Sequence, residues 1–229
     1  MEENNLKHIA IVLDGNRRFA KRLMLQPWKG HEYGAEKVEK LLDYAHELGI
    51  KELTLYCLSV ENLRNRPKRE LGYLLDIFRK EFKNIDREKI EKNKIRIRFI
   101  GNLELLPLDL RELCMKLEKE TEENDNFIVN FAIAYGGRQE IISAVRKIVQ
   151  NKVKADKINE ENFGNYLYMN DSPELIIRTG GEKRTSNFLL WQGAYSEWFF
   201  LDKFWPEFEK EDLVNCIEEF KKRKRNFGK

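Results

Sequence analysis

Residues 8–21 of the chain read HIAIVLDGNRRFAK. The apolar run Ile9–Leu13 has the length and composition of a buried strand, and it ends at a single carboxylate, Asp14. A glycine, an amide and two guanidinium groups come next: Gly15, Asn16, Arg17 and Arg18. Glycine lets the backbone approach a ligand closely, and the guanidinium fork matches pairs of phosphate oxygens. The stretch therefore predicts half of a diphosphate-binding site.

The composition predicts one globular domain that spans residues 1–229. Hydrophobic residues make up 41% of the chain and aromatic residues 11%, which is enough for a sizeable core, and no stretch rich in Pro, Gly or Ser divides it. The 42 Lys and Arg residues nearly balance the 39 Asp and Glu residues, which leaves a formal net charge of +3. Dedicated nucleic-acid binders usually have a one-sided basic charge, so we expect no nucleic-acid partner.

Cysteine usage and the lack of a targeting segment predict a cytoplasmic protein. Cys57, Cys114 and Cys216 are odd in number and lack metal-ligand spacing, which indicates reduced thiols. No signal peptide is visible, and the most apolar stretch, residues 188–201, is shorter than the ~20 residues that a spanning helix needs. The basic run Lys221–Arg225 is typical of a solvated helix end, with anionic lipid or a partner chain as the alternative contact.

Strand-like and helix-like segments alternate along the chain. Short apolar runs predict strands at Ile9–Leu13, Leu53–Leu58, Ile95–Ile100, Ile128–Ala134, Leu175–Ile177 and Trp198–Leu201. Apolar residues with helical spacing predict helices at Ala35–Leu48, Glu70–Asn84, Asp109–Glu123, Gln139–Val149 and Lys210–Arg223. Such alternation is typical of βαβ units, so we expect an α/β fold with a central, mostly parallel sheet flanked by helices.

Polar motifs follow four of the predicted strands. They occupy residues 14–18, 59–62, 134–138 and 178–186. In a parallel sheet the carboxyl ends of the strands meet at one edge, and ligands bind in the crevice beyond them. The four loops therefore predict a single pocket for an anionic ligand.

The loop after the fifth predicted strand is the second candidate for anion binding. Gly180 and Gly181 allow a tight turn whose N–H groups can face an anion. Arg178, Arg184 and Ser186 add two guanidinium groups and a hydroxyl. The loop lacks the G-x-x-x-x-G-K-[ST] pattern of a Walker loop, and an ordinary surface turn is the alternative interpretation.

Asp14 and His31 each have two interpretations. Asp14 either caps the following helix or binds Mg²⁺, which typically takes one or two carboxylates together with water and phosphate oxygens. Glu197 is a candidate second ligand, or a surface glutamate. His31 either caps a helix or donates a hydrogen bond to a phosphate group.

The segment that follows the second predicted strand also has two interpretations. Ser59, Glu61 and Asn62 are turn-capping residues by default, and residues close to a bound ligand in the functional interpretation. The predicted helix Glu70–Asn84 presents more apolar residues than a narrow stripe needs. It either belongs to the ordinary core or also faces an internal apolar channel.

Six motifs occur in a fixed order between His8 and Gly228: HIAIVLDGNRRFAK, GHEYGAEKV, LTLYCLSVENLRNRP, FAIAYGGRQEI, LIIRTGGEKRTSNFLLWQGAYSEWFF and FWPEF. Together they resemble the cis-prenyltransferase family, the group of undecaprenyl and dehydrodolichyl diphosphate synthases. The DGNRR form is similar to that of archaeal and eukaryotic members. The DDxxD motifs of trans-type prenyl synthases do not occur.

The resemblance implies a homodimer in which each chain has a parallel six-stranded sheet and a hydrophobic tunnel. It implies repeated Mg²⁺-dependent condensation of isopentenyl diphosphate onto an allylic diphosphate, with a cis double bond added at each step. The product would be a long-chain polyprenyl diphosphate, the precursor of a glycosyl carrier lipid. The primer is farnesyl or geranylgeranyl diphosphate, with the archaeal-like signature favouring the latter. A lipid product also leads us to expect a peripheral membrane contact.

The resemblance also implies roles for individual residues. Asp14 would bind Mg²⁺ and aid departure of the allylic diphosphate, with Glu197 as a second metal ligand. Asn62 is the proposed proton-transfer residue. The implied substrate-binding residues are Gly15, Asn16, Arg17, Arg18, Phe19, His31, Ser59, Val60, Glu61, Leu63, Arg64, Arg66, Arg178, Arg184, Thr185 and Ser186.

Several positions depart from the family pattern near the predicted allylic site. Pro27 stands where an arginine is common, and the candidates to replace that arginine are Arg17, Arg22 and Lys29. Leu63 stands in place of an aromatic residue.

Other departures lie further along the chain. Arg64 and Arg66 both fit one substrate-binding position. Lys183 replaces a histidine that is associated with metal binding in bacterial members. Residues 226–228 lack the arginine of the usual C-terminal signature, which puts in question whether this tail completes a partner's site.

Two other functions remain as alternatives. A non-catalytic partner subunit of the same superfamily would keep the sheet but tend to lose the Asp-Gly-Asn-Arg and Arg-Thr-Gly-Gly loops, and both loops are present here. A generic phosphate-ester enzyme on an α/β sheet would have a small pocket in place of a long apolar one.

Overall fold

A computed structural model describes residues 6–223 of the chain. Its central sheet has six strands in the order β3-β4-β2-β1-β5-β6, and every pairing between them is parallel. The strands are β1 (His8–Val12), β2 (Glu52–Ser59), β3 (Ile95–Ile100), β4 (Phe127–Tyr135), β5 (Leu175–Arg178) and β6 (Glu197–Phe200). The predicted α/β fold is confirmed, and all six predicted strands are present within a residue of their expected ends.

The strands are buried on both faces, as parallel strands usually are. In β1, Ile9 and Ile11 point to one face and Ala10 to the other, and all three are fully buried. The register places Ile11 beside Leu55 of β2 and Ile177 of β5. This double burial explains why the strand sequences are continuous apolar runs and do not alternate.

The five long predicted helices are confirmed, with small shifts at their ends. They are α2 (Gly30–Glu47), α4 (Lys68–Lys83), α6 (Leu108–Glu120), α7 (Gly137–Gln150) and α9 (Lys210–Lys222). Helix α2 begins five residues before the predicted position because the 3₁₀ turn Pro27–Lys29 leads directly into it. The short helix α1 (Asn16–Arg22) is the one that the capping interpretation of Asp14 implied. Three other short helices were not predicted, since seven residues or fewer are too short to show periodicity: α3 (Val60–Asn65), α5 (Arg87–Asn93) and α8 (Glu160–Phe163).

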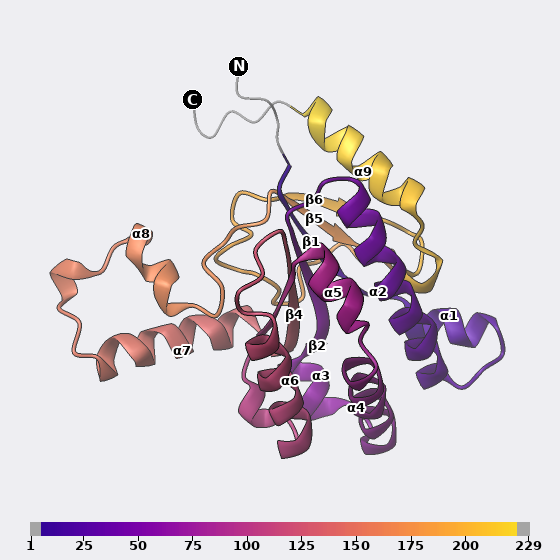
Figure 1. Cartoon of the computed structure of the whole chain (residues 1–229), viewed down its shortest axis with the longest axis horizontal. Helices are drawn as coiled ribbons and strands as arrows, with labels where there is room; N and C mark the ends of the chain where they lie inside the picture. The colour runs from indigo at the N-terminus through magenta and orange to yellow at the C-terminus, as the bar shows by residue number, and fades with distance from the viewer. Residues whose placement is uncertain (1–5, 224–229) are drawn as a thin grey trace.

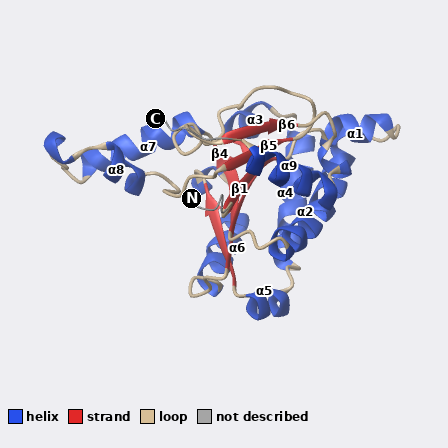
Figure 2. Ribbon diagram, turned by 90° about the horizontal axis from the view of Figure 1, so that it is seen from above, coloured by secondary structure: helices blue, strands red, loops and turns tan. Residues whose placement is uncertain are grey.

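The two faces of the sheet are covered differently. The larger core lies between one face and helices α2, α4, α5, α6 and α9, and the smaller core lies between the other face and the loops after α8. Helices α7 and α8 project beyond the sheet at the end of the molecule away from α1 (Figures 1 and 2).

Two further expectations concern the thiols and the termini. Cys57, Cys114 and Cys216 are all free. None of the helices in residues 6–223 is long and apolar enough to cross a membrane. Part of the basic run, Lys224 and Arg225, and the C-terminal signature at residues 226–228 lie outside the described residues.

Candidate active site

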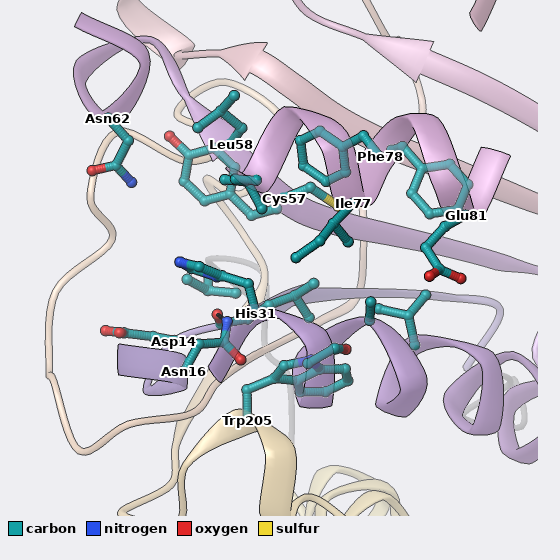
Figure 3. Close-up of a pocket in the computed structure, with 18 of the residues that line it drawn as sticks. Asp14, Asn16, His31, Cys57, Leu58, Asn62, Ile77, Phe78, Glu81 and Trp205 are labelled. Atoms are coloured by element: carbon teal, nitrogen blue, oxygen red, sulfur yellow. Dashed lines mark hydrogen bonds between the residues drawn. The ribbon is translucent and has the colours of Figure 1, made fainter. Parts of the chain in front are cut away.

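A cavity of about 1010 Å³ lies at the carboxyl edge of the sheet, where the sequence predicts the ligand site. One part is polar and is lined by the ends of β1, β2 and β5 with α1 and the start of α2. The other part is apolar and runs between α2 and α4 (Figure 3). Most of the predicted site residues line it: Asp14, Gly15, Asn16, Arg17, Arg18, His31, Ser59, Glu61, Asn62, Arg66, Arg178, Arg184 and Ser186.

Asp14 is held in the polar part from both its backbone and its side chain. Its N–H donates to Thr179 Oγ1 at 3.1 Å, and its carbonyl oxygen accepts from the Thr179 hydroxyl at 2.8 Å. Its carboxylate oxygens accept from Arg18 at 3.2 Å and from Arg178 at 2.9 Å. The helix-cap interpretation is wrong, because the N-cap of α1 is Gly15 and no side chain caps that helix.

Gly15 allows a close approach of the backbone, but to a protein side chain. Its φ of 110° lies in the region that glycine adopts without strain. A Cβ atom at this position would come within 2.9 Å of Phe204. The glycine is therefore required by the turn from β1 into α1 and by its packing.

Arg178 connects Asp14 to the second loop. The side chain is buried, and one of its Nη atoms donates to Asp14 Oδ2. The other donates to Ser186 Oγ at 2.7 Å and to the carbonyl oxygen of Arg184. A buried guanidinium group needs compensating acceptors. Arg178, the last residue of β5, finds two of them in the loop that follows, and so holds Arg184 and Ser186 in place.

The prediction that the N–H groups of Gly180 and Gly181 face an anion is wrong. The Gly180 N–H donates to the Lys203 carbonyl oxygen at 2.8 Å, and the Gly181 N–H donates to the Leu201 carbonyl oxygen at 2.9 Å. Both glycines have the positive φ that a tight turn requires, 88° and 75°. The tight turn is as predicted, but carbonyl oxygens of the chain after β6 accept hydrogen bonds from both glycine N–H groups. The anion-binding groups of this loop are therefore its side chains.

Glu182 joins the two predicted anion-binding loops. One of its carboxylate oxygens lies 3.4 Å from an Arg18 nitrogen, and the other lies 2.6 Å from an Arg184 nitrogen. Arg18 and Arg184 therefore lie on the same side of the molecule. Sequence analysis did not predict that Glu182 would join the two loops. The one sign of it in the sequence is that Glu182 lies two residues before Arg184.

A second polar group surrounds the start of α2. Buried Glu70 lies 3.3 Å from an Arg66 nitrogen and 3.5 Å from nitrogens of both Arg17 and His31. Burial, and then the charge of Arg66, lowers the pKa of His31 to about 4, so the ring is neutral near pH 7. Arg66 donates to His31 Nε2 at 2.8 Å. His31 lies inside α2, so the capping interpretation is wrong.

The polar group at the start of α2 offers candidates to replace the arginine that is common in the resembled family where this chain has Pro27. Of the residues considered as substitutes, Arg17 lines the cavity, whereas Arg22 pairs with Glu207 and Lys29 pairs with Glu32. Arg66 also lines the cavity, beside His31, and exposed Arg64 is not among its lining residues. The geometry favours Arg66 over Arg64 as the residue that faces a ligand. Glu70 was not predicted, because its sequence position suggests only the start of a helix.

The segment after β2 combines a cap with a site-facing side chain. Ser59 Oγ accepts from the Asn62 N–H at 3.0 Å, so the predicted turn-capping role of Ser59 is confirmed. The side chain of Asn62 points toward the cavity (Figure 3). Glu61 accepts from Asn187 at 2.9 Å and from Gln139 at 3.4 Å.

Several predicted substrate-binding residues do not line the cavity. Val60, the first residue of α3, is buried, and Leu63 packs against the larger core. Phe19 packs edge-on against Tyr33, with ring centroids 5.3 Å apart. Thr185 lines a separate, smaller pocket beside the mouth. These side chains support the site from behind or lie next to it.

Glu197 lies away from Asp14. It is the first residue of β6 and pairs in register with Leu175, whereas Asp14 follows the last residue of β1. In a parallel sheet these positions are at opposite edges, and Glu197 contacts Arg223 there. One chain therefore does not bring the two carboxylates to a common metal ion. Among residues 6–223, no three His, Cys, Asp or Glu side chains form a metal-binding cluster.

The apolar part of the cavity extends beneath α4. Helix α4 contributes to both the core and the cavity lining. Cys57 lies in this part, and burial raises the pKa of its thiol to about 12, which leaves it protonated. The apolar lining residues are Val38, Leu42, Leu74, Ile77, Phe78, Phe82, Ile85, Ile90, Ile95, Ile97, Val129 and Phe131.

Comparison with known proteins places this geometry in a family. The model of the putative undecaprenyl diphosphate synthase family matches residues 12–228. A protein of Methanopyrus kandleri is 50% identical over 97% of this chain and 84% of its own length. A protein of Pyrococcus abyssi is 45% identical over 97% of this chain and 87% of its own length. Both are described as tritrans,polycis-undecaprenyl-diphosphate synthases specific for geranylgeranyl diphosphate.

Solved structures agree with this assignment. Lavandulyl diphosphate synthase of Lavandula x intermedia, in complex with dimethylallyl diphosphate, superposes with a TM-score of 0.92 at 33% identity and covers 98% of both chains. A probable undecaprenyl diphosphate synthase of Campylobacter jejuni superposes with a TM-score of 0.83 at 36% identity, over 99% of this chain and 100% of that one. The chain therefore belongs to the undecaprenyl diphosphate synthase family of cis-prenyltransferases, and it is an enzyme that transfers prenyl groups.

Proposed function

We propose that this cis-prenyltransferase condenses isopentenyl diphosphate repeatedly onto geranylgeranyl diphosphate to form a long-chain polyprenyl diphosphate. The observation that carries the proposal is the shared Glu182 contact, which holds Arg18 and Arg184 together at the mouth of a largely apolar cavity. Two diphosphates repel one another strongly, so their reaction needs cations on both sides. The first and fifth strand ends supply those cations.

The two loops would divide the substrates between them. Arg17, Arg18 and the neutral His31 face the position proposed for the allylic diphosphate. Arg178, Arg184 and Ser186 would bind isopentenyl diphosphate. Glu182 contacts the guanidinium groups of Arg18 and Arg184, and substrate phosphates would take over these contacts.

The reaction itself transfers a carbon chain to a double bond. The allylic C–O bond breaks and diphosphate leaves, the double bond of isopentenyl diphosphate supplies the electrons for the new C–C bond, and a proton is then lost. Asn62 lines the cavity, and we propose that it assists that proton transfer. Asp14 and its arginine partners would order the leaving group.

Asp14 also fits Mg²⁺ binding. Its side chain lines the cavity and is 30% exposed. Mg²⁺ commonly takes one protein carboxylate together with water and substrate phosphate oxygens. When bound, the metal would neutralise negative charge on the departing diphosphate. Glu197 would contribute to the same ion only from outside this chain, given its place at the opposite sheet edge.

The apolar part of the cavity would serve as the tunnel that receives the growing chain. Burial of each added carbon gains roughly 0.8 kcal/mol, which favours successive additions until the apolar lining is filled. The choice of geranylgeranyl diphosphate over farnesyl diphosphate rests on the relatives, which are described as specific for the former. We further propose that the product is the precursor of a glycosyl carrier lipid, as the resemblance to the family implies.

A homodimer is part of the proposal. The exposed face of α7 carries Ile142, Val145 and Val149, which are 52%, 47% and 70% exposed and are spaced to form one stripe. Helices α7 and α8 project from the body of the molecule (Figure 1), where a second copy has room to cover this stripe.

The decisive experiment is incorporation of labelled isopentenyl diphosphate into butanol-extractable product by the purified chain with Mg²⁺. We expect efficient incorporation with geranylgeranyl diphosphate, lower incorporation with farnesyl diphosphate, and none after chelation of the metal. Mass analysis of the product gives its length. A chain that is folded but inactive with both primers would contradict the proposal.

A further inference from the structure

The turn after α1 exposes three consecutive apolar side chains, Leu23, Met24 and Leu25, which we name the α1 tip. Their exposed fractions are 46%, 96% and 39%. Helix α1 and the turn that follows it lie at the outer edge of the molecule, at the end opposite to α7 and α8 (Figures 1 and 2). On the same helix, residues 15–18 and Lys21 line the cavity. The tip is therefore a short distance along the chain from the active-site mouth.

The tip is an ordered turn, because backbone hydrogen bonds fix it. The Met24 N–H donates to the Lys21 carbonyl oxygen at 3.0 Å, and the Leu25 N–H donates to the Ala20 carbonyl oxygen at 2.9 Å. These bonds form a Schellman motif, whose left-handed position is usually glycine. Here Met24 occupies it, with φ of 58°. The fold does not need this side chain, since glycine would adopt the turn with less strain and the side chain is almost fully exposed.

The chain segment that contains the tip is basic in sequence. Residues 16–31 contain five Lys and Arg residues and no Asp or Glu. Lys21 and Arg22 form the last turn of α1, directly before the tip. Arg22 contacts Glu207 and Lys29 contacts Glu32, whereas Lys21 has no ion pair within the described part of the chain.

Aromatic side chains complete the border of the tip. Tyr33 is 40% exposed and packs against Phe19, which lies on α1 four residues before Leu23. The Arg69 guanidinium lies over the Trp28 ring, 5.2 Å from its centroid. Aromatic rings with a polar or cationic neighbour are favourable at the boundary between lipid headgroups and acyl chains.

We infer that the α1 tip inserts into an anionic phospholipid surface, with Met24 at its deepest point. An exposed apolar point with a basic border combines burial of apolar area with attraction to anionic headgroups. Docking in this way would bring the cavity mouth toward the lipid phase. That advantage depends on the proposed function, whereas the docking itself can be measured without any turnover.

The test is flotation of the full chain with vesicles of equimolar phosphatidylcholine and phosphatidylglycerol. We expect the wild type to float with these vesicles, less with phosphatidylcholine alone, and less as salt rises. Met24→Glu should lower the partition coefficient about tenfold or more, because it removes apolar burial and adds a charge of the wrong sign. Met115→Glu, at a 57% exposed position on α6, is the matched control and should bind as wild type.

A second variant separates docking from folding. Met24→Gly suits the positive φ, so it should unfold at the same or a higher temperature than wild type and still lose vesicle binding. Condensation activity in detergent should be unchanged in both Met24 variants. A wild type that does not float would overturn the inference, and so would equal losses for Met24→Glu and Met115→Glu.

Two further results have defined meanings. A change of oligomeric state in Met24→Glu would show that the tip contacts a second copy, and would overturn lipid docking. A chain that is inactive toward prenyl diphosphates, yet floats through Met24, would contradict the proposed function and support the docking site.

Discussion

Two polar clusters lie at opposite edges of the same sheet, and of these two only the one at the carboxyl edge lines the active-site cavity. At the carboxyl edge, Asp14, Arg178 and Ser186 are joined by hydrogen bonds and line the active-site cavity. Near the amino edge, His8 and Glu52 lie beside a Thr and an Asn on the neighbouring strands. We name this group of four residues the sealed cluster: His8, Glu52, Thr54 and Asn130.

The groups of the sealed cluster hydrogen-bond mainly to one another, although within residues 6–223 His8 Nδ1 and Asn130 Oδ1 lack a hydrogen-bond partner. Asn130 donates to Glu52 at 2.7 Å and to Thr54 Oγ1 at 2.9 Å, and Thr54 Oγ1 lies 2.7 Å from His8 Nε2. Burial raises the pKa of Glu52, and burial followed by the charge of Arg98 lowers the pKa of His8 to about 3. Perturbed pKa values therefore mark the sealed cluster, which does not line the active-site cavity, so a shifted pKa by itself does not identify a ligand site in this protein.

The largest effect is expected for Asp14→Asn, which tests directly whether the carboxyl-edge cluster is the catalytic one. Asp14→Asn should lower kcat about 10²- to 10³-fold, because it removes the charge that would order the leaving group and bind the metal. Asn keeps an oxygen that accepts from Arg178, so the unfolding temperature should fall by only a few degrees. Initial rates with labelled isopentenyl diphosphate and a thermal melt measure both quantities.

The matched control for that variant is Glu52→Gln in the sealed cluster. It should leave kcat per folded molecule unchanged and reduce the free energy of unfolding by about 1–3 kcal/mol, since a buried hydrogen-bond pattern is altered. Loss of kcat in Glu52→Gln, or full activity in Asp14→Asn, would reverse the roles assigned to the two clusters.

A smaller effect is expected for Arg66→Gln, which tests whether the residues that line the cavity are those that bind the substrate. Arg66→Gln should raise the KM for the allylic diphosphate by roughly 10- to 100-fold, through loss of one charge-assisted contact at the group around Glu70. Arg64→Gln, two positions earlier and exposed, should change this KM little. Equal effects of the two substitutions would show that the cavity lining does not define the site.

The last prediction concerns the pH dependence of stability. The pKa of His8 is about 3 in the folded protein and near 6.5 when unfolded, so the unfolded chain binds the extra proton between these values. Stability is fully present above pH 6.5 and falls as pH decreases toward 3, by roughly 1.4 kcal/mol per pH unit for one such group.

His31, whose pKa is about 4, contributes in the same direction over the narrower window from pH 6.5 to 4. His8→Gln should therefore make the loss of stability shallower without removing it. Denaturant unfolding at several pH values between 4 and 7 measures the slope, and an unchanged slope in His8→Gln would contradict burial of a neutral His8.

The sequence alone determined the strands, the long helices and the edge of the sheet at which the site lies. These features depend on local apolar periodicity and on motifs that directly follow strand ends, so neighbouring residues in the chain suffice to predict them. The paired loops at residues 14–18 and 178–186 are predictable for the same reason.

Only the tertiary structure decided which groups neutralise one another within that site. Glu182 joins Arg18 to Arg184, buried Glu70 collects three partners, and the N–H groups of Gly180 and Gly181 bond to the chain after β6. It also placed Glu197 at the far edge of the sheet. Each of these outcomes depends on segments that are far apart in the sequence, and their contacts are set by the parallel crossovers and by side-chain packing, which no local pattern encodes.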